Sequence, residues 1–90
     1  YRLVEEYFTK HAVAKFFPHA LGHGLGFLGA CPPFLTPTSS DILEEGDLIT
    51  IEPGLYVPTL GGCRIEDIFR VTEEGAEPVS LLSLPWLTNA

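Results

Sequence analysis

Two stretches decide the fold of this chain: Leu48-Ile-Thr-Ile-Glu-Pro-Gly-Leu-Tyr-Val57 and Cys63-Arg-Ile-Glu-Asp-Ile-Phe-Arg-Val-Thr72. Both are rich in β-branched, aromatic and other apolar residues, which is typical of β-strands. The short segment 58–62 separates them, so we expect the two strands to pair antiparallel. Each stretch carries one glutamate, Glu52 or Glu66, among apolar neighbours, where an unpaired carboxylate is costly to bury.

The rest of the chain predicts one helix and two further strands. Apolar residues at helical spacing over residues 1–15 predict an amphipathic helix that ends at Pro18. Glycines alternate with apolar residues over 19–28, which predicts an extended strand, and residues 76–79 predict a short strand after a turn. The segment 31–40, rich in proline, serine and threonine, predicts an irregular surface loop. One helix followed by antiparallel strands is an α+β pattern.

Composition limits the class of protein. The 90 residues suffice for one small domain, and 46% apolar residues with 19% charged residues indicate a globular chain. The formal charge of −7 leaves no basic patch, so we expect neither a nucleic-acid surface nor a membrane surface. Cys31 and Cys63 are too few for a disulfide scaffold. We expect both thiols to be reduced, the location to be cytoplasmic, and Trp86 in the C-terminal tail to pack back on the body.

His19 and His23 are the first candidate ligands. Gly22 and Gly24 disfavour a helix here, and in an extended strand residues four apart point to the same side. Both imidazoles are therefore candidates to face one cleft, where nitrogen and carboxylate oxygen donors suit a divalent metal ion. The alternative is a pair of ordinary histidines in a Gly-rich strand.

The two glutamates supply the carboxylates of such a site. Period-two alternation places Arg64 and Glu66 on one face of their strand, and Asp67 on the other. Arg64 can orient a carboxylate or bind an anionic group of a substrate, whereas a plain surface ion pair between Arg64 and Glu66 is the alternative. Glu52 is either a metal ligand or an exposed residue where Pro53 ends the strand.

Pairing around residues 58–62 makes a geometric prediction. We expect Val57 to lie opposite Cys63 or a residue near it, which places Glu66 roughly across from Gly54. Glu52 then lies two residues further along, on the same face as Glu66.

Taken together, these segments resemble the pita-bread metallopeptidases. That family carries a histidine in a Gly-rich stretch, a glutamate in a T-I-E-P-G-x-Y strand and a glutamate in a G-x-R-x-E-D strand, in this order. The segments 50–56 and 62–67 match both motifs without adjustment. The resemblance covers residues 19–79. Arg64 favours the proline-specific branch, which comprises Xaa-Pro dipeptidase (prolidase) and Xaa-Pro aminopeptidase.

The resemblance implies a fold and a metal site. The fold is the C-terminal half of a pita-bread domain, with one helix followed by antiparallel strands. His23 and Glu52 correspond to ligands of one metal ion, and Glu66 corresponds to a carboxylate that bridges two. The implied cofactors are two divalent ions, with Mn²⁺ preferred and Co²⁺ or Zn²⁺ as alternatives.

The resemblance also implies a reaction, the hydrolysis of the peptide bond that precedes proline in a dipeptide or peptide. His19 and Arg64 correspond to catalytic residues of the substrate pocket, and Glu52 to the glutamate that moves the proton of the attacking water. Tyr56 corresponds to a residue that supports the ligands from behind. A homodimer is compatible with this family.

The chain departs from the family pattern at two points. The family site needs two further aspartates from strands upstream of the histidine, whereas Asp41, Asp47 and Asp67 all follow His23. We therefore expect residues 1–90 to be the C-terminal part of a single catalytic domain and to be inactive without the N-terminal half. Ala30 occupies the place of a second substrate-binding histidine, and loss of one such donor typically costs about 10²–10³ in rate.

Two other functions stay open. The same fold also serves in recognition, so a pita-bread module that binds without catalysis is one alternative. A free-standing zinc domain built from His19, His23, Cys31 and Cys63 is the other.

Overall fold

The strands of this protein pair antiparallel throughout the part that the structure describes, residues 1–80 of a computed structural model. One helix precedes them, so the predicted α+β class is confirmed. The elements are α1 (Arg2–Lys10), the 3₁₀-helix η1 (Ala14–Phe16), β1 (Gly22–Gly26), β2 (Gly29–Leu35), β3 (Leu48–Ile51), β4 (Gly54–Val57), β5 (Gly61–Arg64), β6 (Asp67–Thr72) and β7 (Gly75–Pro78).

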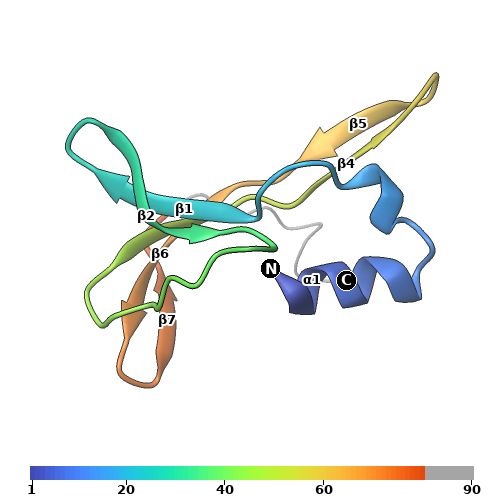
Figure 1. Ribbon diagram of the computed structural model, residues 1–90. Coiled ribbons are helices and arrows are strands. Elements are labelled where there is room, and N and C mark those ends of the chain that lie inside the picture. Colours follow the sequence, from blue (N-terminus) through green and yellow to red (C-terminus); the bar gives the residue numbers. More distant parts are fainter. Residues whose placement is uncertain (81–90) are drawn as a thin grey trace.

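The strands are divided between a sheet and a ribbon. Five strands form one sheet in the order β2-β1-β3-β6-β7, and β4 pairs with β5 in a separate two-stranded ribbon. Figure 1 shows that the ribbon extends away from the sheet and that α1 lies below it, with η1 between the two. The buried apolar side chains of the described residues are Phe17 and Leu21, which precede β1, Ile49 on β3 and Val71 on β6.

The helix is shorter than the sequence predicts, because it ends well before Pro18. Lys10 is its last residue and Ala12 follows with a φ of 60°. The amide of Ala12 donates to the carbonyl of Thr9 at 3.0 Å, and the amide of Val13 donates to the carbonyl of Phe8 at 2.9 Å. These two bonds are those of a Schellman motif, which ends a helix by satisfying its last carbonyls.

The proline-rich segment is a strand, so the prediction of a loop over 31–40 is wrong for its first half. Strand β2 runs from Gly29 to Leu35 and includes Pro32 and Pro33. It lies at the edge of the five-stranded sheet. A proline has no amide N–H to donate, and a central strand must pair with a neighbour on each side. An edge strand pairs on one side only, so it tolerates a proline there.

Strand β1 is also shorter than the predicted 19–28. It begins at Gly22, so His19 lies before the strand and only His23 lies within it. The two histidines therefore do not lie on one strand, and the prediction that both point to the same side of it is wrong.

Each of the two long predicted strands is broken in the middle. Residues 48–57 form β3 and β4 with a gap at Glu52 and Pro53, and residues 61–72 form β5 and β6 with a gap at Ile65 and Glu66. The breaks lie opposite each other, and the ladder therefore passes from the sheet into the ribbon. Pro53 contributes to this break because it has no amide to donate.

The predicted register of this hairpin is wrong by two residues. Val57 pairs with Gly61, and Gly54 pairs with Arg64 rather than with Glu66. The cause is a tight turn, in which the amide of Leu60 donates to the carbonyl of Val57 at 3.1 Å, so pairing starts earlier than expected.

The prediction for Trp86 lies outside the described residues. Among the helices of residues 1–80, none has the length and apolar character needed to cross a membrane.

Candidate metal centre

His23 is the second residue of β1 and has a defined ring orientation. Its Nδ1 lies 2.8 Å from the carbonyl oxygen of Gly24. Because a carbonyl oxygen only accepts, we assign the proton to Nδ1, which leaves the lone pair of Nε2 free. A histidine that donates from one ring nitrogen to a backbone carbonyl is the usual arrangement of a metal ligand.

Glu52 presents a carboxylate oxygen to that nitrogen. The distance from His23 Nε2 to Glu52 Oε2 is 3.6 Å. Two donors that bind one ion at about 2.1 Å lie roughly 3.0–3.6 Å apart for angles near 90–120°. The backbone holds Glu52 in place, since its amide donates to the carbonyl of Leu21 at 2.7 Å. The donor pair therefore fits a single divalent ion.

Thr50 connects these two residues, a role that the motifs alone do not predict. Its hydroxyl donates to Glu52 Oε2 at 2.9 Å and accepts from the amide of His23 at 3.1 Å. The position inside the T-I-E-P-G motif, two residues before Glu52, was the available signal. In a strand this spacing puts the hydroxyl on the face of the carboxylate.

Glu66 lies across the hairpin from Glu52. Pro53 accepts a hydrogen bond from the amide of Ile65 at 3.2 Å, and Ile51 pairs with Asp67. These two links enclose Glu52 and Glu66, so the register sets them opposite each other. Within residues 1–80, however, no three side chains of His, Cys, Asp or Glu are grouped closely enough to hold a metal ion. The structure brings His23 and Glu52 together and does not add Glu66 to the group.

Arg64 is exposed at the end of β5, beside the break that contains Glu66. The described ion pairs do not include one between Arg64 and Glu66, so the alternative of a surface ion pair is wrong. The guanidinium of Arg64 is thus left at the rim of the hairpin, and its role in binding an anionic group stays a prediction.

His19 and Tyr56 form a second polar pair. The Nδ1 of His19 lies 2.8 Å from the carbonyl oxygen of Ala20, and its Nε2 lies 2.8 Å from the hydroxyl of Tyr56. By the same reasoning Nδ1 carries the proton, so the Tyr56 hydroxyl donates to Nε2. Both ring nitrogens of His19 are therefore engaged.

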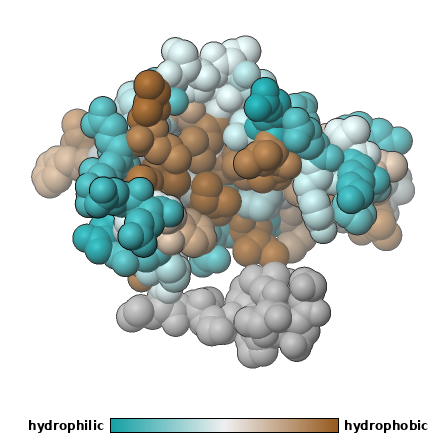
Figure 2. All heavy atoms as spheres, turned by 90° about the horizontal axis from the view of Figure 1, so that it is seen from below, coloured by the Kyte–Doolittle hydropathy of each residue, from teal (hydrophilic) through white to brown (hydrophobic). Residues whose placement is uncertain are grey.

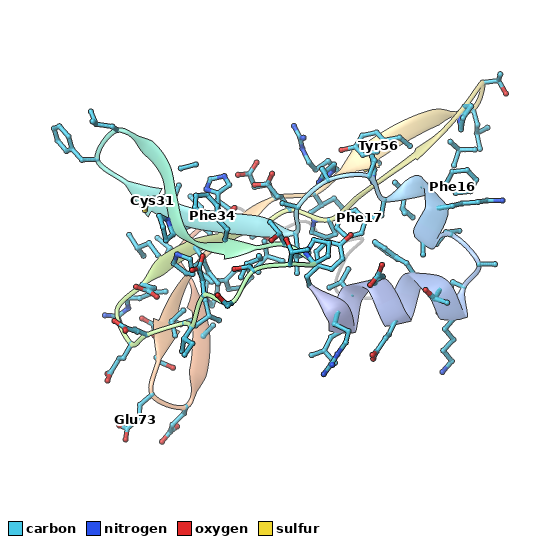
Figure 3. All side chains as sticks on the ribbon, in the orientation of Figure 1. Phe16, Phe17, Cys31, Phe34, Tyr56 and Glu73 are labelled. Atoms are coloured by element: carbon cyan, nitrogen blue, oxygen red, sulfur yellow. The ribbon has the colours of Figure 1, made fainter. Side chains whose placement is uncertain are left out.

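Aromatic packing and a glycine position this pair. The His19 ring stands edge-on to Phe17 with the centroids 5.2 Å apart, and Figure 3 shows Tyr56 on the ribbon with Phe17 between ribbon and helix. A Cβ on Gly54 would lie 2.5 Å from the Tyr56 hydroxyl and 3.0 Å from His19 Nε2. Only a glycine leaves room for the hydrogen bond at this position.

The cysteines and Ala30 lie outside the donor pair. Cys31 is half-buried on β2 and Cys63 is exposed on β5, and both are free thiols. Among the described residues, His19, His23, Cys31 and Cys63 do not come together as one group of metal donors. Ala30 is exposed near the tip of the β1–β2 hairpin, where it pairs with Leu25.

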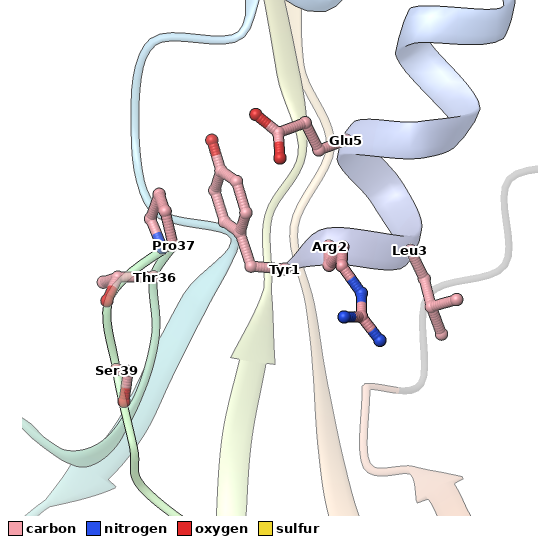
Figure 4. Close-up of a pocket in the computed structure, with 7 residues that line it drawn as sticks. All are labelled: Tyr1, Arg2, Leu3, Glu5, Thr36, Pro37 and Ser39. Atoms are coloured by element: carbon pink, nitrogen blue, oxygen red, sulfur yellow. The ribbon is translucent and has the colours of Figure 1, made fainter.

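A pocket of about 450 Å³ lies between the first turn of α1 and the segment that follows β2 (Figure 4). It shares no residue with the candidate centre. Its lining residues are Tyr1, Arg2, Leu3, Glu5, Thr36, Pro37 and Ser39.

Comparison with known proteins identifies the family. The model of metallopeptidase family M24 matches residues 1–73, and the chain belongs to this family. A dipeptidase-like protein of Bacillus subtilis, YkvY, is 46% identical over 76 residues, which cover 84% of this chain and 20% of that protein. The chain thus spans about a fifth of the length of this curated relative.

Solved structures of the same family confirm the fold. The Xaa-Pro dipeptidase from Bacillus anthracis matches with a TM-score of 0.86 and 40% identity, over 90% of this chain and 23% of that one. The X-Pro aminopeptidase from Thermotoga maritima matches with a TM-score of 0.85 and 30% identity, over 91% of this chain and 23% of that one. The predicted resemblance to the pita-bread metallopeptidases is therefore confirmed.

Proposed function

We propose that this chain supplies part of the metal site of a peptidase that hydrolyses the bond before proline, acting as an Xaa-Pro dipeptidase. The observation that carries the proposal is the donor pair of His23 Nε2 and Glu52 Oε2, 3.6 Å apart. An imidazole and a carboxylate with free lone pairs suit Mn²⁺, and also Co²⁺ or Zn²⁺. Membership of a metallopeptidase family supports the same chemistry.

The residues have separate roles in this proposal. His23 and Glu52 would hold a divalent ion, and Glu66, across the hairpin, would supply a further carboxylate to the metal site. Divalent ions bound there would lower the pKa of a bound water and polarise the scissile carbonyl. Glu52 would accept a proton from the water that adds to the carbonyl and would pass it to the leaving amine. His19, fixed by Tyr56, lines the substrate pocket, and Arg64 binds the carboxylate end of the substrate.

The donor set further supports a domain larger than residues 1–90. Three carboxylate and imidazole donors are fewer than a dinuclear site needs, and this chain covers about a fifth of YkvY. We therefore propose that residues 1–90 form the C-terminal part of one catalytic domain and that two further carboxylates come from another part of it. A homodimer and a cytoplasmic location stay predictions.

A binding module without catalysis is the second candidate, and Ala30 favours it. The proline-specific enzymes of this family carry a histidine at this place, whereas the described structure has an exposed alanine there. An Xaa-Pro aminopeptidase is a variant of the first candidate, since the two enzymes differ in the length of their substrate.

The test uses the complete protein that contains this chain. Calorimetry measures its binding of Mn²⁺, and a peptide assay compares its cleavage of Ala-Pro with that of Ala-Ala and Ala-Pro-Ala. We expect cleavage before proline only, with preference for the dipeptide. His23→Ala and Glu52→Gln should each lower Mn²⁺ affinity by at least about tenfold, because each removes a ligand.

Two matched variants control for the loss of a histidine or a charge. His11→Ala removes an exposed histidine at the end of α1, and Glu74→Gln neutralises an exposed glutamate in a turn. Both should bind Mn²⁺ as the unchanged protein does. Mn²⁺ binding without any cleavage would favour the binding module, and unchanged affinity in His23→Ala would contradict the metal site.

A further inference from the structure

Thr50 is the most deeply buried side chain of the described residues, and it is polar. Its exposed fraction is 1%, and it lies on the central strand β3. Because Gly24 pairs with Ile49 across β1 and β3, His23 lies opposite Thr50. Residues opposite each other in an antiparallel pair project on the same face. The hydroxyl of Thr50 therefore lies between the backbone of one ligand candidate and the carboxylate of the other.

The direction of the hydrogen bonds follows from the groups involved. The amide of His23 can only donate, so it occupies a lone pair of the Thr50 oxygen at 3.1 Å. The hydroxyl proton is then directed to Glu52 Oε2 at 2.9 Å, which as a carboxylate oxygen accepts. This is the same oxygen that faces His23 Nε2 at 3.6 Å. One hydroxyl thus selects which carboxylate oxygen is presented to the imidazole.

The backbone around Thr50 leaves little room for an alternative arrangement. A Cβ on Gly22 would lie 1.8 Å from the carbonyl oxygen of Thr50, so β1 and β3 approach as closely as glycine allows. The amide of Glu52 is also tied to Leu21 at 2.7 Å. What remains free is the glutamate side chain, whose rotamers the Thr50 hydroxyl restricts.

We propose that Thr50 is a positioning residue, which holds the Glu52 carboxylate beside His23 Nε2 and thereby raises the affinity of the site for a divalent ion. This inference rests on the proposed function and deepens it. Thr50 itself contacts neither the ion nor the substrate. Hydrogen-bond partners behind metal ligands typically contribute about 10–100-fold to metal affinity.

The experiment compares Thr50→Val, Thr50→Ser and Thr50→Cys in the complete protein. Valine keeps the shape and removes the hydroxyl, serine keeps the hydroxyl, and cysteine keeps a weak donor. We expect Thr50→Val to raise the dissociation constant of Mn²⁺, measured by calorimetry, about tenfold. Thr50→Ser should stay within about threefold of the unchanged protein, and Thr50→Cys should fall between the two. Thr72→Val, a half-buried threonine on β6 away from the site, is the matched control.

Two further readouts separate positioning from a structural role. Unfolding curves show whether each variant is folded at the temperature of the titration. The second readout is activity at two Mn²⁺ concentrations: the activity of Thr50→Val should be closer to that of the unchanged protein at saturating Mn²⁺ than at limiting Mn²⁺. A folded Thr50→Val with unchanged Mn²⁺ affinity would overturn the inference, whatever its stability. If Thr50→Val does not fold, a folded Thr50→Cys with unchanged Mn²⁺ affinity would likewise overturn the inference.

The outcomes also separate this inference from the proposed function. A protein that binds Mn²⁺ in a Thr50-dependent way but cleaves no Xaa-Pro peptide would refute the peptidase and support the positioning role. If the unchanged protein cleaves Xaa-Pro peptides and Thr50→Val binds Mn²⁺ with unchanged affinity, the peptidase is supported and the positioning role is refuted. An unchanged protein that binds no Mn²⁺ would overturn both.

Discussion

At the scale of single residues, the candidate centre depends on how closely two strands approach. The imidazole of His23 and the carboxylate of Glu52 come from β1 and from the residue after β3. Their meeting requires that the backbone of Gly22 pass directly over Thr50. The glycine is therefore as necessary to the site as the ligands are, although it contributes no donor atom.

Gly22→Ala tests this requirement. The new Cβ would lie 1.8 Å from the carbonyl oxygen of Thr50, a backbone atom that cannot move without separating the strands. We expect the free energy of unfolding to fall by about 3 kcal/mol, the upper end of the range for overpacking. Urea denaturation measures the change.

Gly75→Ala is the matched control for that substitution. It also adds a methyl group at the end of a strand, but no atom lies within 4 Å of the new Cβ. Its stability should stay within about 0.5 kcal/mol of the unchanged protein. Equal effects of the two substitutions would show that the close approach of β1 and β3 is not a constraint.

At the scale of secondary-structure elements, the end of α1 carries an unfavourable residue. Ala12 has a φ of 60° in the Schellman motif, a position at which glycine is the usual residue. A left-handed conformation costs an alanine roughly 1–2 kcal/mol. Glycine avoids this cost, but part of the gain is offset because glycine has more conformational freedom to lose from the unfolded chain.

Ala12→Gly should therefore stabilise the protein by about 0.5–1 kcal/mol, measured as a shift of the urea midpoint. Ala14→Gly is the comparison, because Ala14 lies in the 3₁₀-helix η1 and has no positive φ. That substitution should destabilise the protein by about 0.5–1 kcal/mol. A loss of stability in Ala12→Gly would mean that the helix end does not carry this strain.

The sequence predicted the elements better than their ends. The α+β class, the antiparallel hairpin around residues 58–62 and the strand that carries His23 are as expected, because each depends on local patterns of apolar residues. The break at Glu52 and Pro53 was not predicted, since the apolar run continues through it to Val57. Strand β2 was missed because the tolerance of Pro32 and Pro33 depends on their edge position, which is a property of the whole sheet.

The same limit applies to the candidate site. The motifs indicated His23, Glu52 and Glu66. The structure places His23 Nε2 3.6 Å from Glu52 Oε2, and the role of the three residues as metal ligands stays a prediction. The hydrogen bond of His19 to Tyr56 joins residues 37 positions apart, and no local pattern specifies such a contact. The motif contains Thr50 but does not predict its role, because that role depends on a contact with His23 on the neighbouring strand.

At the scale of the whole molecule, many apolar side chains remain uncovered. Phe27 and Leu28, at the turn between β1 and β2, are exposed to 103% and 97%. Figure 2 shows hydrophobic side chains gathered over the middle of one face, with hydrophilic residues on either side. Among residues 1–80, β2 and β7 are the two edge strands of the five-stranded sheet. Such surfaces and edges promote association.

These features predict how the 90-residue chain behaves by itself. We expect it to bind Mn²⁺ weakly and to cleave no Ala-Pro or Leu-Pro, because its described residues bring only two donors together. Calorimetry and a peptide-cleavage assay on the purified chain measure both. Detectable cleavage by this chain, in a preparation free of any longer form, would contradict the prediction. Denatured chain serves as the control for metal bound without structure.

The broken hairpin has a consequence for engineering. The ladder keeps one register on both sides of the break, so Glu52 stays opposite Glu66 whatever the length of the arm beyond Gly54 and Arg64. The turn at residues 58–60 is exposed at the far end of that arm. Peptide tags or reporter sequences grafted there would leave the facing glutamates in place. A single residue added between Pro53 and Gly54 would instead shift one side of the hairpin against the other.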